Sequence, residues 1–246
     1  FALEMALARI RQLSAHEVGH TIGLAHNFAA SSKGRSSVMD YPHPTLSIKD
    51  GQVDFTDAYD TKIGDWDKVS IAYSYGEYLE DEDVSLSKLL DDAFKKGARF
   101  ITDQDARPLG SAHAYAHLWD NGSDVTTELE NLLSIRRNSI ANFSKDNIKS
   151  NQPYSVLEDV FVPLYFLHRY QTEGVTKVIG GLDYTYALKD DGNTIVKRIP
   201  GKIERKALSS IIKTLSIEEL AIPKKLLNLF PPRAFNYGRT RESFKS

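Results

Sequence analysis

Three histidines and a glutamate near the start of the chain have the types and the spacing that bind a metal ion. They lie in the stretch HEVGHTIGLAHN, as His16, Glu17, His20 and His26. Residues four apart on a helix share a face, so His16 and His20 can direct their imidazoles to one point. Two imidazoles suit Zn²⁺, which takes nitrogen ligands in a tetrahedron and keeps one position open for solvent at a catalytic site.

A base and a glycine complete this pattern. Glu17 follows His16 directly, and from there its carboxylate can reach a water molecule at the metal and take its proton. A continuous helix would carry His26 away from the ion. Gly23 can take a positive φ at little cost, which ends the helix and returns His26 as a third ligand. The stretch therefore predicts one Zn²⁺ ion held by His16, His20 and His26, with Glu17 as the general base.

A second stretch, SSVMDYP at residues 36–42, reads as a tight turn that contains Met39. The pattern HExxHxxGxxH followed by such a methionine turn resembles the metzincin clan of zinc peptidases. The resemblance implies that Met39 forms a floor under the imidazoles. It also implies that Tyr41 is a switch tyrosine, which ligates zinc or hydrogen-bonds the tetrahedral intermediate. The alternatives are ordinary core packing for Met39 and a turn aromatic that covers the core for Tyr41.

The resemblance narrows when further segments are included. The zinc stretch, SVMDYP, the GDWD segment at residues 64–67 and PPR at residues 231–233 are together similar to the bacterial zinc-dependent metalloproteases called met-zincins. That family implies hydrolysis of a peptide or protein substrate outside the cytoplasm. In metzincins a twisted sheet precedes the active-site helix, whereas here the helical pattern opens at Phe1. The resemblance thus predicts a fragment that lacks the N-terminal part of a parent protein and cleaves peptides more slowly than that parent.

Length, charge and composition exclude several other classes of function. The 246 residues are enough for one large domain or two small ones. A formal net charge of −2 gives no indication of a nucleic-acid partner or of an anionic membrane surface. No apolar run approaches the ~20 residues of a membrane span. The absence of cysteine excludes thiol chemistry and a cysteine-based zinc site, and it leaves the redox compartment open.

The remaining periodicity predicts a mainly α fold with short β-hairpins. Residues 1–80 are predicted to be the zinc-binding half of a metzincin-like catalytic domain, and residues 81–246 a mostly helical C-terminal region. The turn dipeptide Asp50-Gly51 predicts one hairpin, and alternating residues predict another near 182–199.

Other polar residues are open to two interpretations. His43 is either a fourth metal ligand or a histidine that lines the cleft, and the second is preferred because three ligands and water complete a catalytic zinc site. His113 and His117 are either a second metal pair or residues of the core or the cleft lining. Asp57, Asp65 and Asp67 suggest calcium or helix capping, and the lack of the regular alternation and closing glutamate of a calcium loop favours capping.

Taken together, these observations predict a zinc peptidase with metal-activated water and a glutamate base. Two alternatives of other classes stay open. One is a catalytically silent binding or structural module stabilised by zinc, which has no need of Glu17. The other is a metal-dependent hydrolase of a non-peptide bond.

Overall fold

The computed structural model describes residues 2–108, 110–233 and 235–238. Its architecture is mainly α with short β-hairpins, as predicted. The α-helices are α1 (Ala2–Thr21), α2 (Asp65–Tyr75), α3 (Glu82–Lys95), α4 (Asp103–Ala106), α5 (Val125–Ala141), α6 (Leu157–Tyr165), α7 (Arg169–Thr176), α8 (Gly201–Thr214), α9 (Ile217–Leu220) and α10 (Lys224–Leu227). The 3₁₀ segments are η1 (Ala30–Lys33), η2 (Lys145–Asn147) and η3 (Tyr154–Val156). The strands are β1 (Ser47–Lys49), β2 (Gln52–Asp54), β3 (Leu182–Tyr184) and β4 (Val196–Arg198).

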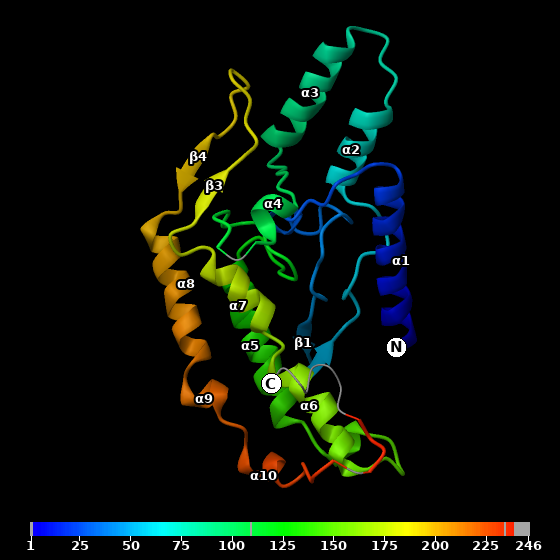
Figure 1. The fold of residues 1–246 in the computed structure, drawn as a ribbon, viewed down its shortest axis with the longest axis vertical. Coiled ribbons are helices and arrows are strands. Elements are labelled where there is room, and N and C mark those ends of the chain that lie inside the picture. Colours follow the sequence, from blue (N-terminus) through cyan, green and yellow to red (C-terminus); the bar gives the residue numbers. More distant parts are fainter. Residues whose placement is uncertain (1, 109, 234, 239–246) are drawn as a thin grey trace.

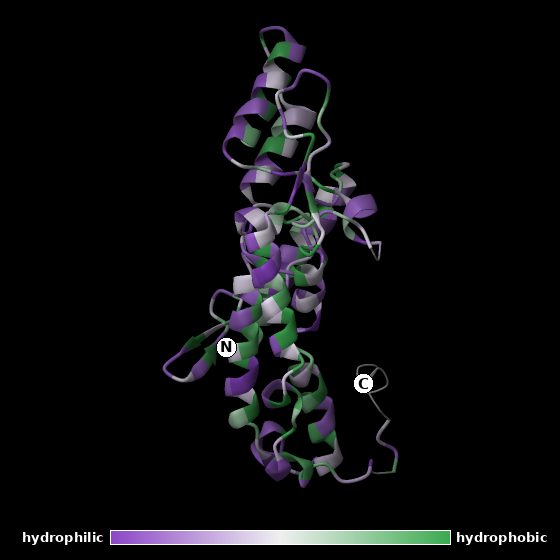
Figure 2. Ribbon diagram, turned by 90° about the vertical axis from the view of Figure 1, so that its left-hand side faces the viewer, coloured by the Kyte–Doolittle hydropathy of each residue, from purple (hydrophilic) through white to green (hydrophobic). Residues whose placement is uncertain are grey.

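The molecule is elongated, with α1 along one edge and α8 along the opposite edge (Figure 1). Helices α2 and α3 form a helical hairpin at one end. Helix α5 lies inside and contacts α6, α7, α8 and the β1–β2 hairpin. Hydrophilic and hydrophobic stretches alternate along the helices, which is the pattern of elements that bury one side only (Figure 2).

Helix α5 is the centre of the larger core. Asp124 caps its N-terminus, because the carboxylate accepts hydrogen bonds from the backbone amides of Thr126 and Thr127. Burial of each leucine or isoleucine in such a core stabilises the fold by about 1.5–3 kcal/mol. The core-facing apolar residues of α5 are Val125, Leu129, Leu132, Leu133, Ile135 and Ile140.

A buried ion pair connects α5 with α9. The guanidinium of Arg136 on α5 donates to Glu219 over 3.0 Å and to the backbone oxygen of Tyr165 over 2.7 Å. His168, which precedes α7, interacts electrostatically with both Arg136 and Glu219. Burial, and next the positive charge of Arg136, lower the pKa of His168 to about 4.

Replacement of His168 by glutamine is expected to flatten the acid limb of the stability profile. An imidazole with a pKa of about 4 in the fold and 6.5 in the unfolded chain binds fewer protons when folded. Its contribution is therefore complete above pH 6.5 and is lost as the pH falls from 6.5 to 4. The free energy of unfolding in urea should fall between pH 7 and pH 4.5 in both proteins. The fall should be about 1–3 kcal/mol smaller in His168→Gln than in the unsubstituted chain. Equal losses in the two proteins would contradict this assignment.

Both predicted hairpins are present. β1 and β2 pair antiparallel through Ile48 and Val53, and the turn residues Asp50 and Gly51 have φ of 51° and 75°. Positive φ at both central positions matches the twist of the strands, which is why Asp-Gly is favoured there. In the second hairpin β3 and β4 pair antiparallel with Asp183 opposite Lys197.

The predicted boundary at residue 80 falls in the turn between α2 and α3. These two helices pack against each other, and Asp81 caps α3 by accepting from the amide of Val84. The division of the chain into residues 1–80 and 81–246 stays a prediction.

Helix α1 packs through its polar face. Gln12, His16 and Gly19 are buried, whereas Leu3 and Ile10 on the other side are 67% and 58% exposed. The helix is therefore held by the side that carries Gln12 and His16, and its apolar residues Leu3 and Ile10 face solvent. Among the described residues, every helix is too short or too polar to cross a lipid bilayer.

Candidate metal centre and active site

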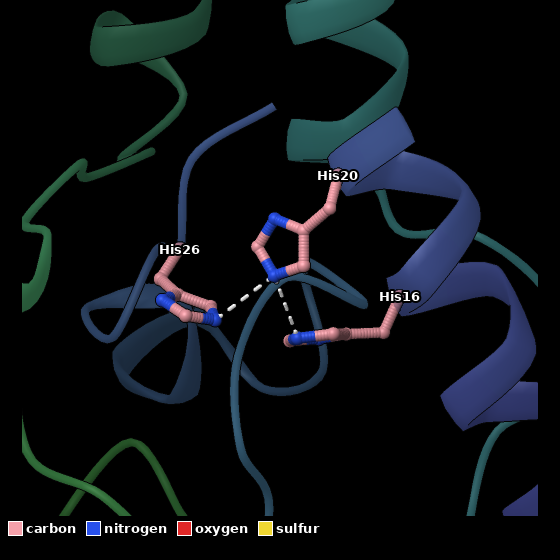
Figure 3. Close-up of side chains that lie close together, drawn as sticks. All are labelled: His16, His20 and His26. Carbon is pink, nitrogen blue, oxygen red and sulfur yellow. Dashed lines mark hydrogen bonds between the residues drawn. The ribbon is translucent and has the colours of Figure 1, made fainter. Parts of the chain in front are cut away.

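The three predicted histidines meet at one point (Figure 3). His16 and His20 extend from the last turns of α1, which ends at Thr21. Gly23 has a φ of 85°, and two hydrogen bonds close the helix end: the amide of Gly23 to the oxygen of His20, and the amide of Leu24 to the oxygen of Gly19, each over 3.0 Å. This is the left-handed glycine cap expected from the sequence, and it brings His26 back towards the helix.

The Nε2 atoms of the three imidazoles face one another. His20 Nε2 lies 3.1 Å from His16 Nε2 and 3.0 Å from His26 Nε2. Zn–N bonds of 2.0–2.1 Å in a tetrahedron place ligand nitrogens roughly 3.3–3.4 Å apart. The three nitrogens are therefore close to the spacing that one zinc ion requires, and the donor set fits a zinc centre.

Each imidazole is oriented by a different partner on its Nδ1 atom. His16 donates to the backbone oxygen of Val38 over 2.7 Å, and His20 donates to that of Leu24 over 3.0 Å. His26 contacts the carboxylate of Asp103 over 2.8 Å. A carbonyl oxygen only accepts, so Nδ1 carries the proton and the Nε2 lone pair is left for a metal. Burial also lowers the pKa of His16, which favours the neutral form that binds metal.

Met39 lies directly beneath the histidine-bearing helix. It is 1% exposed, and a Cβ added to Gly19 would lie 2.3 Å from its Sδ atom. Glycine at this position between Glu17 and His20 is thus what allows the methionine to approach the helix backbone. The amide of Asn27 donates to the oxygen of Met39 over 3.0 Å, which joins this turn to the chain after the third histidine.

Asp67 holds the turn that contains Met39 through hydrogen bonds to its carboxylate. It accepts from the hydroxyl of Ser37 over 2.5 Å, from the amide of Val38 over 2.8 Å and from the amide of Gly64 over 2.6 Å. The predicted capping role is confirmed, because the bond to Gly64 caps α2. Val38 in turn supplies the oxygen that orients His16. The GDWD segment is therefore a structural support of the metal site.

The two predicted catalytic residues, Glu17 and Tyr41, both lie near the histidines. Glu17 is exposed on α1, and its negative charge acts on His16. The ring of Tyr41 lies 4.8 Å from the ring of His16 and 4.9 Å from that of His26, measured between centroids. Tyr41 also packs against Phe28 and Trp119 at 5.9 and 5.2 Å. This packing agrees with the core-covering interpretation and leaves the switch role as a prediction.

A comparison with known families bears on this site. A family model described as Met-zincin matches residues 1–245. The chain belongs to the Met-zincin family. Searches of curated proteins and of solved structures returned no match.

Membership of the Met-zincin family agrees with the geometry. The family indicates a zinc metallopeptidase, and this Met-zincin brings together three histidines that can hold a metal ion. A peptide substrate follows at the level of the family. The general base and the class of peptidase belong to the proposal made below.

Asp103 is the site residue that the sequence did not indicate. It lies at the start of α4, 77 positions after His26, and it also pairs with Arg107 over 3.2 Å. Burial would raise the pKa of Asp103, but the contacts with His26 and Arg107 outweigh burial and lower it. The carboxylate therefore stays ionised and can stabilise a partial positive charge on a metal-bound imidazole.

Substitution Asp103→Asn in this Met-zincin is expected to weaken zinc binding by ~10-fold or more. Partners of this kind on the second nitrogen of a ligand histidine contribute 10–100-fold to metal affinity. Competition with a fluorescent zinc chelator measures the change. Asp105→Asn on the same short helix is the matched control, because Asp105 pairs with Tyr184 and Tyr186 instead. Equal affinities in both variants would rule out an orienting role for Asp103.

Substitution Gly19→Ala is expected to destabilise the fold by about 1–3 kcal/mol through overpacking against Met39. The added methyl group has no space, since Met39 is itself buried. Urea unfolding of the variant with and without zinc measures the effect. Ser14→Ala, an exposed position of the same helix, provides the reference. An equal change of the urea unfolding midpoint in Gly19→Ala and Ser14→Ala would show that the fold accommodates the added methyl group beside Met39.

The other histidines lie outside the metal group. The Nδ1 of His43 contacts the oxygen of Pro44 at 3.0 Å. His113 contacts the oxygen of Tyr184 and accepts from the amide of Tyr115, so it is a core residue. His117 lies 3.6 Å from Glu173. Within the described residues, none of these joins a group of three ligands.

Proposed function

We propose that the chain is a zinc-dependent endopeptidase that uses Glu17 as general base. The observation that carries the proposal is the convergence of three imidazoles, with His20 Nε2 3.1 Å from His16 Nε2 and 3.0 Å from His26 Nε2, and with an exposed glutamate on the helix that carries His16 and His20. His16, His20 and His26 would hold one Zn²⁺ ion. When bound, zinc supplies the positive charge that polarises a peptide carbonyl and makes water a better nucleophile.

The residues of the chain perform the proton transfers. Glu17 takes a proton from the attacking water, whose oxygen forms a bond with the carbonyl carbon of the peptide. Glu17 then gives this proton to the amide nitrogen as the carbon–nitrogen bond breaks. The two products carry a new carboxyl group and a new amino group. Tyr41, beside two of the ligands, can donate a hydrogen bond to the oxyanion that forms between these steps.

The site also explains why the ligands keep one arrangement. Val38, Leu24 and Asp103 hold the three rings by separate hydrogen bonds. A site that is preorganised in this way does not have to reorganise as charge develops. The same supports would serve a zinc ion of purely structural role, and the separate contribution of Glu17 distinguishes the two.

The proposal is tested by assaying peptide bonds and zinc together. The zinc-loaded chain is incubated with unfolded casein, and new amino termini are identified by mass spectrometry. Cleavage inside the polypeptide that stops after chelation and returns with one equivalent of Zn²⁺ is the expected result. Hydrolysis of ester substrates without any new amino terminus would favour a non-peptide hydrolase. Full zinc occupancy without hydrolysis of either would favour the silent module.

A further inference from the structure

A large cavity lies beside the metal site and is not used by the mechanism above. Its volume is about 710 Å³, within the range of sites that bind ligands rather than single waters. Its walls come from the chain after α1, from α2 and α3, and from the loop of the β3–β4 hairpin. In Figure 1 these elements surround the upper part of the molecule, with the helical hairpin on one side and the β-hairpin on the other.

The inner wall of the cavity is aromatic. Trp66 stacks on Phe100 at 5.5 Å and on Phe94 at 6.2 Å between ring centroids, and Phe100 meets Tyr186 edge to face at 5.9 Å. Trp66 is 9% exposed, so this stack belongs to the packed interior. The rim includes Leu188, which is 75% exposed. An aromatic wall with an exposed leucine beside it favours a large apolar side chain as ligand.

The cavity and the metal site share a wall. Gly23, Leu24 and Ala25 line the cavity, and they are residues that separate His20 from His26. The oxygen of Leu24 accepts from His20. On the opposite wall, Tyr186 donates to Asp105 over 2.8 Å and accepts from the amide of Thr102 over 3.2 Å, next to the Asp103 that contacts His26. A ligand in the cavity would therefore lie close to a polypeptide at the metal.

The charged residues that line the cavity are all acidic. Its lining includes Asp91, Asp190 and Asp191, and no lysine or arginine occurs among the described lining residues. Asp191 accepts from the amides of Asn193 and Leu188, and these hydrogen bonds lower its pKa, the bond from Asn193 first. It therefore stays ionised at neutral pH. Three carboxylates around an apolar cavity attract a ligand that combines an apolar group with a cation.

We propose that this cavity is a substrate subsite that takes a large apolar side chain adjacent to a lysine or arginine in the polypeptide. The apolar side chain packs against the aromatic wall, and the basic side chain lies at the acidic rim. The inference rests on the proposed peptidase function, because it names the class of polypeptide that this function would select. It assigns specificity to α2, α3 and the β3–β4 loop, which carry none of the metal ligands.

Binding without turnover provides the first test. Fluorescently labelled nine-residue peptides with central Phe-Arg, Ser-Arg or Phe-Glu pairs are titrated with zinc-loaded Glu17→Gln protein, and affinity is read from anisotropy. Replacing the phenylalanine by serine should weaken binding at least ~10-fold, as expected for loss of a buried aromatic side chain. Replacing the arginine by glutamate should weaken it about 5-fold or more, since each exposed charge pair contributes modestly.

Matched variants locate the effect. Ser70→Trp fills the cavity from α2 and should abolish the preference for phenylalanine over serine, whereas Ser209→Trp on the exposed surface of α8 should keep it. Asp91→Asn should reduce the preference for arginine over glutamate about 2-fold or more, whereas Asp92→Asn, its exposed neighbour outside the lining, should not. Asp91→Asn adds no bulk, so it keeps the test valid if the tryptophan variant fails to fold.

Parallel cleavage assays separate this inference from the function on which it rests. Peptides cleaved by the parent without preference for the Phe-Arg pair would overturn the subsite and leave the peptidase intact. Selective binding that Ser70→Trp abolishes, without cleavage of any peptide, would support the cavity as a polypeptide site and refute the peptidase. An unchanged preference in both cavity variants would overturn the subsite.

Discussion

Replacement of Glu17 by glutamine is expected to reduce peptide hydrolysis at least ~100-fold while zinc stays bound, because general-base catalysis contributes 10²–10⁴-fold. Glutamine keeps the size of the side chain and its exposed place on α1. It cannot accept and return a proton as a carboxylate does. The loss should therefore appear in kcat, with little change in KM, since Glu17 acts on the reacting water rather than on the bound peptide.

The control for this prediction is Glu4→Gln, the same change at another exposed position of the same helix. Zinc content is measured in every sample, so that loss of metal is not mistaken for loss of the base. Turnover per bound zinc equal to that of the parent would eliminate Glu17 as the base. It would also revive the silent-module interpretation if the parent itself is inactive.

Removal of the third ligand has the second large expected effect. His26→Ala should weaken zinc binding by more than ~100-fold, since loss of a ligand must exceed the 10–100-fold cost of losing a partner of a ligand. The remaining pair, His16 and His20, would leave Zn²⁺ with two protein nitrogens. Competition with a chelator of known affinity measures the change, and elemental analysis measures the stoichiometry.

The same substitution at His43 tests the alternative ligand. His43 contacts Pro44 and lies outside the three-histidine group, so His43→Ala should leave the affinity within about threefold of the parent, well below the effect of a ligand partner. A large loss in that variant would make His43 a fourth ligand. An unchanged affinity in His26→Ala would refute the three-histidine assignment.

The ranking of these effects follows from distance to the metal. Glu17 acts on the reaction and His26 on the ion itself, whereas Asp103 acts on the ion through His26. Metal affinity should therefore fall in the order parent, Asp103→Asn, His26→Ala. Activity per bound zinc should fall furthest in Glu17→Gln. A purely structural zinc site would show the same order of metal affinities, but no loss of activity in Glu17→Gln.

The position of α1 illustrates a limit of sequence patterns. Leu3 and Ile10 are seven residues apart and share a face of the helix, yet both are exposed. The side that packs contains Gln12, His16 and Gly19. A hydrophobic pattern identifies residues that share a face of a helix, but it does not show whether another element covers that face. Here hydrogen bonds and the close approach at Gly19 position the helix instead.

Local chemistry explains which features the sequence could determine by itself. The convergence of the three histidines depends on a four-residue spacing in a helix and on Gly23, whose φ of 85° is easily adopted only by glycine. The Asp50-Gly51 turn and the Asp124 cap are likewise decided within a few residues. Each of these depends on the backbone preferences of neighbouring residues, so a linear pattern is sufficient.

Only the tertiary structure decided how those residues are supported. Asp103 meets His26 across 77 positions, and Asp67 holds Ser37 and Val38 across about thirty. The cavity beside the three histidines draws its walls from stretches of the chain as far apart as Gly23 and Asn193. Contacts of this kind depend on how whole elements pack, and no spacing along the chain encodes that packing. The sequence alone therefore determined which three histidines converge, and the fold determined what orients them and what lies beside them.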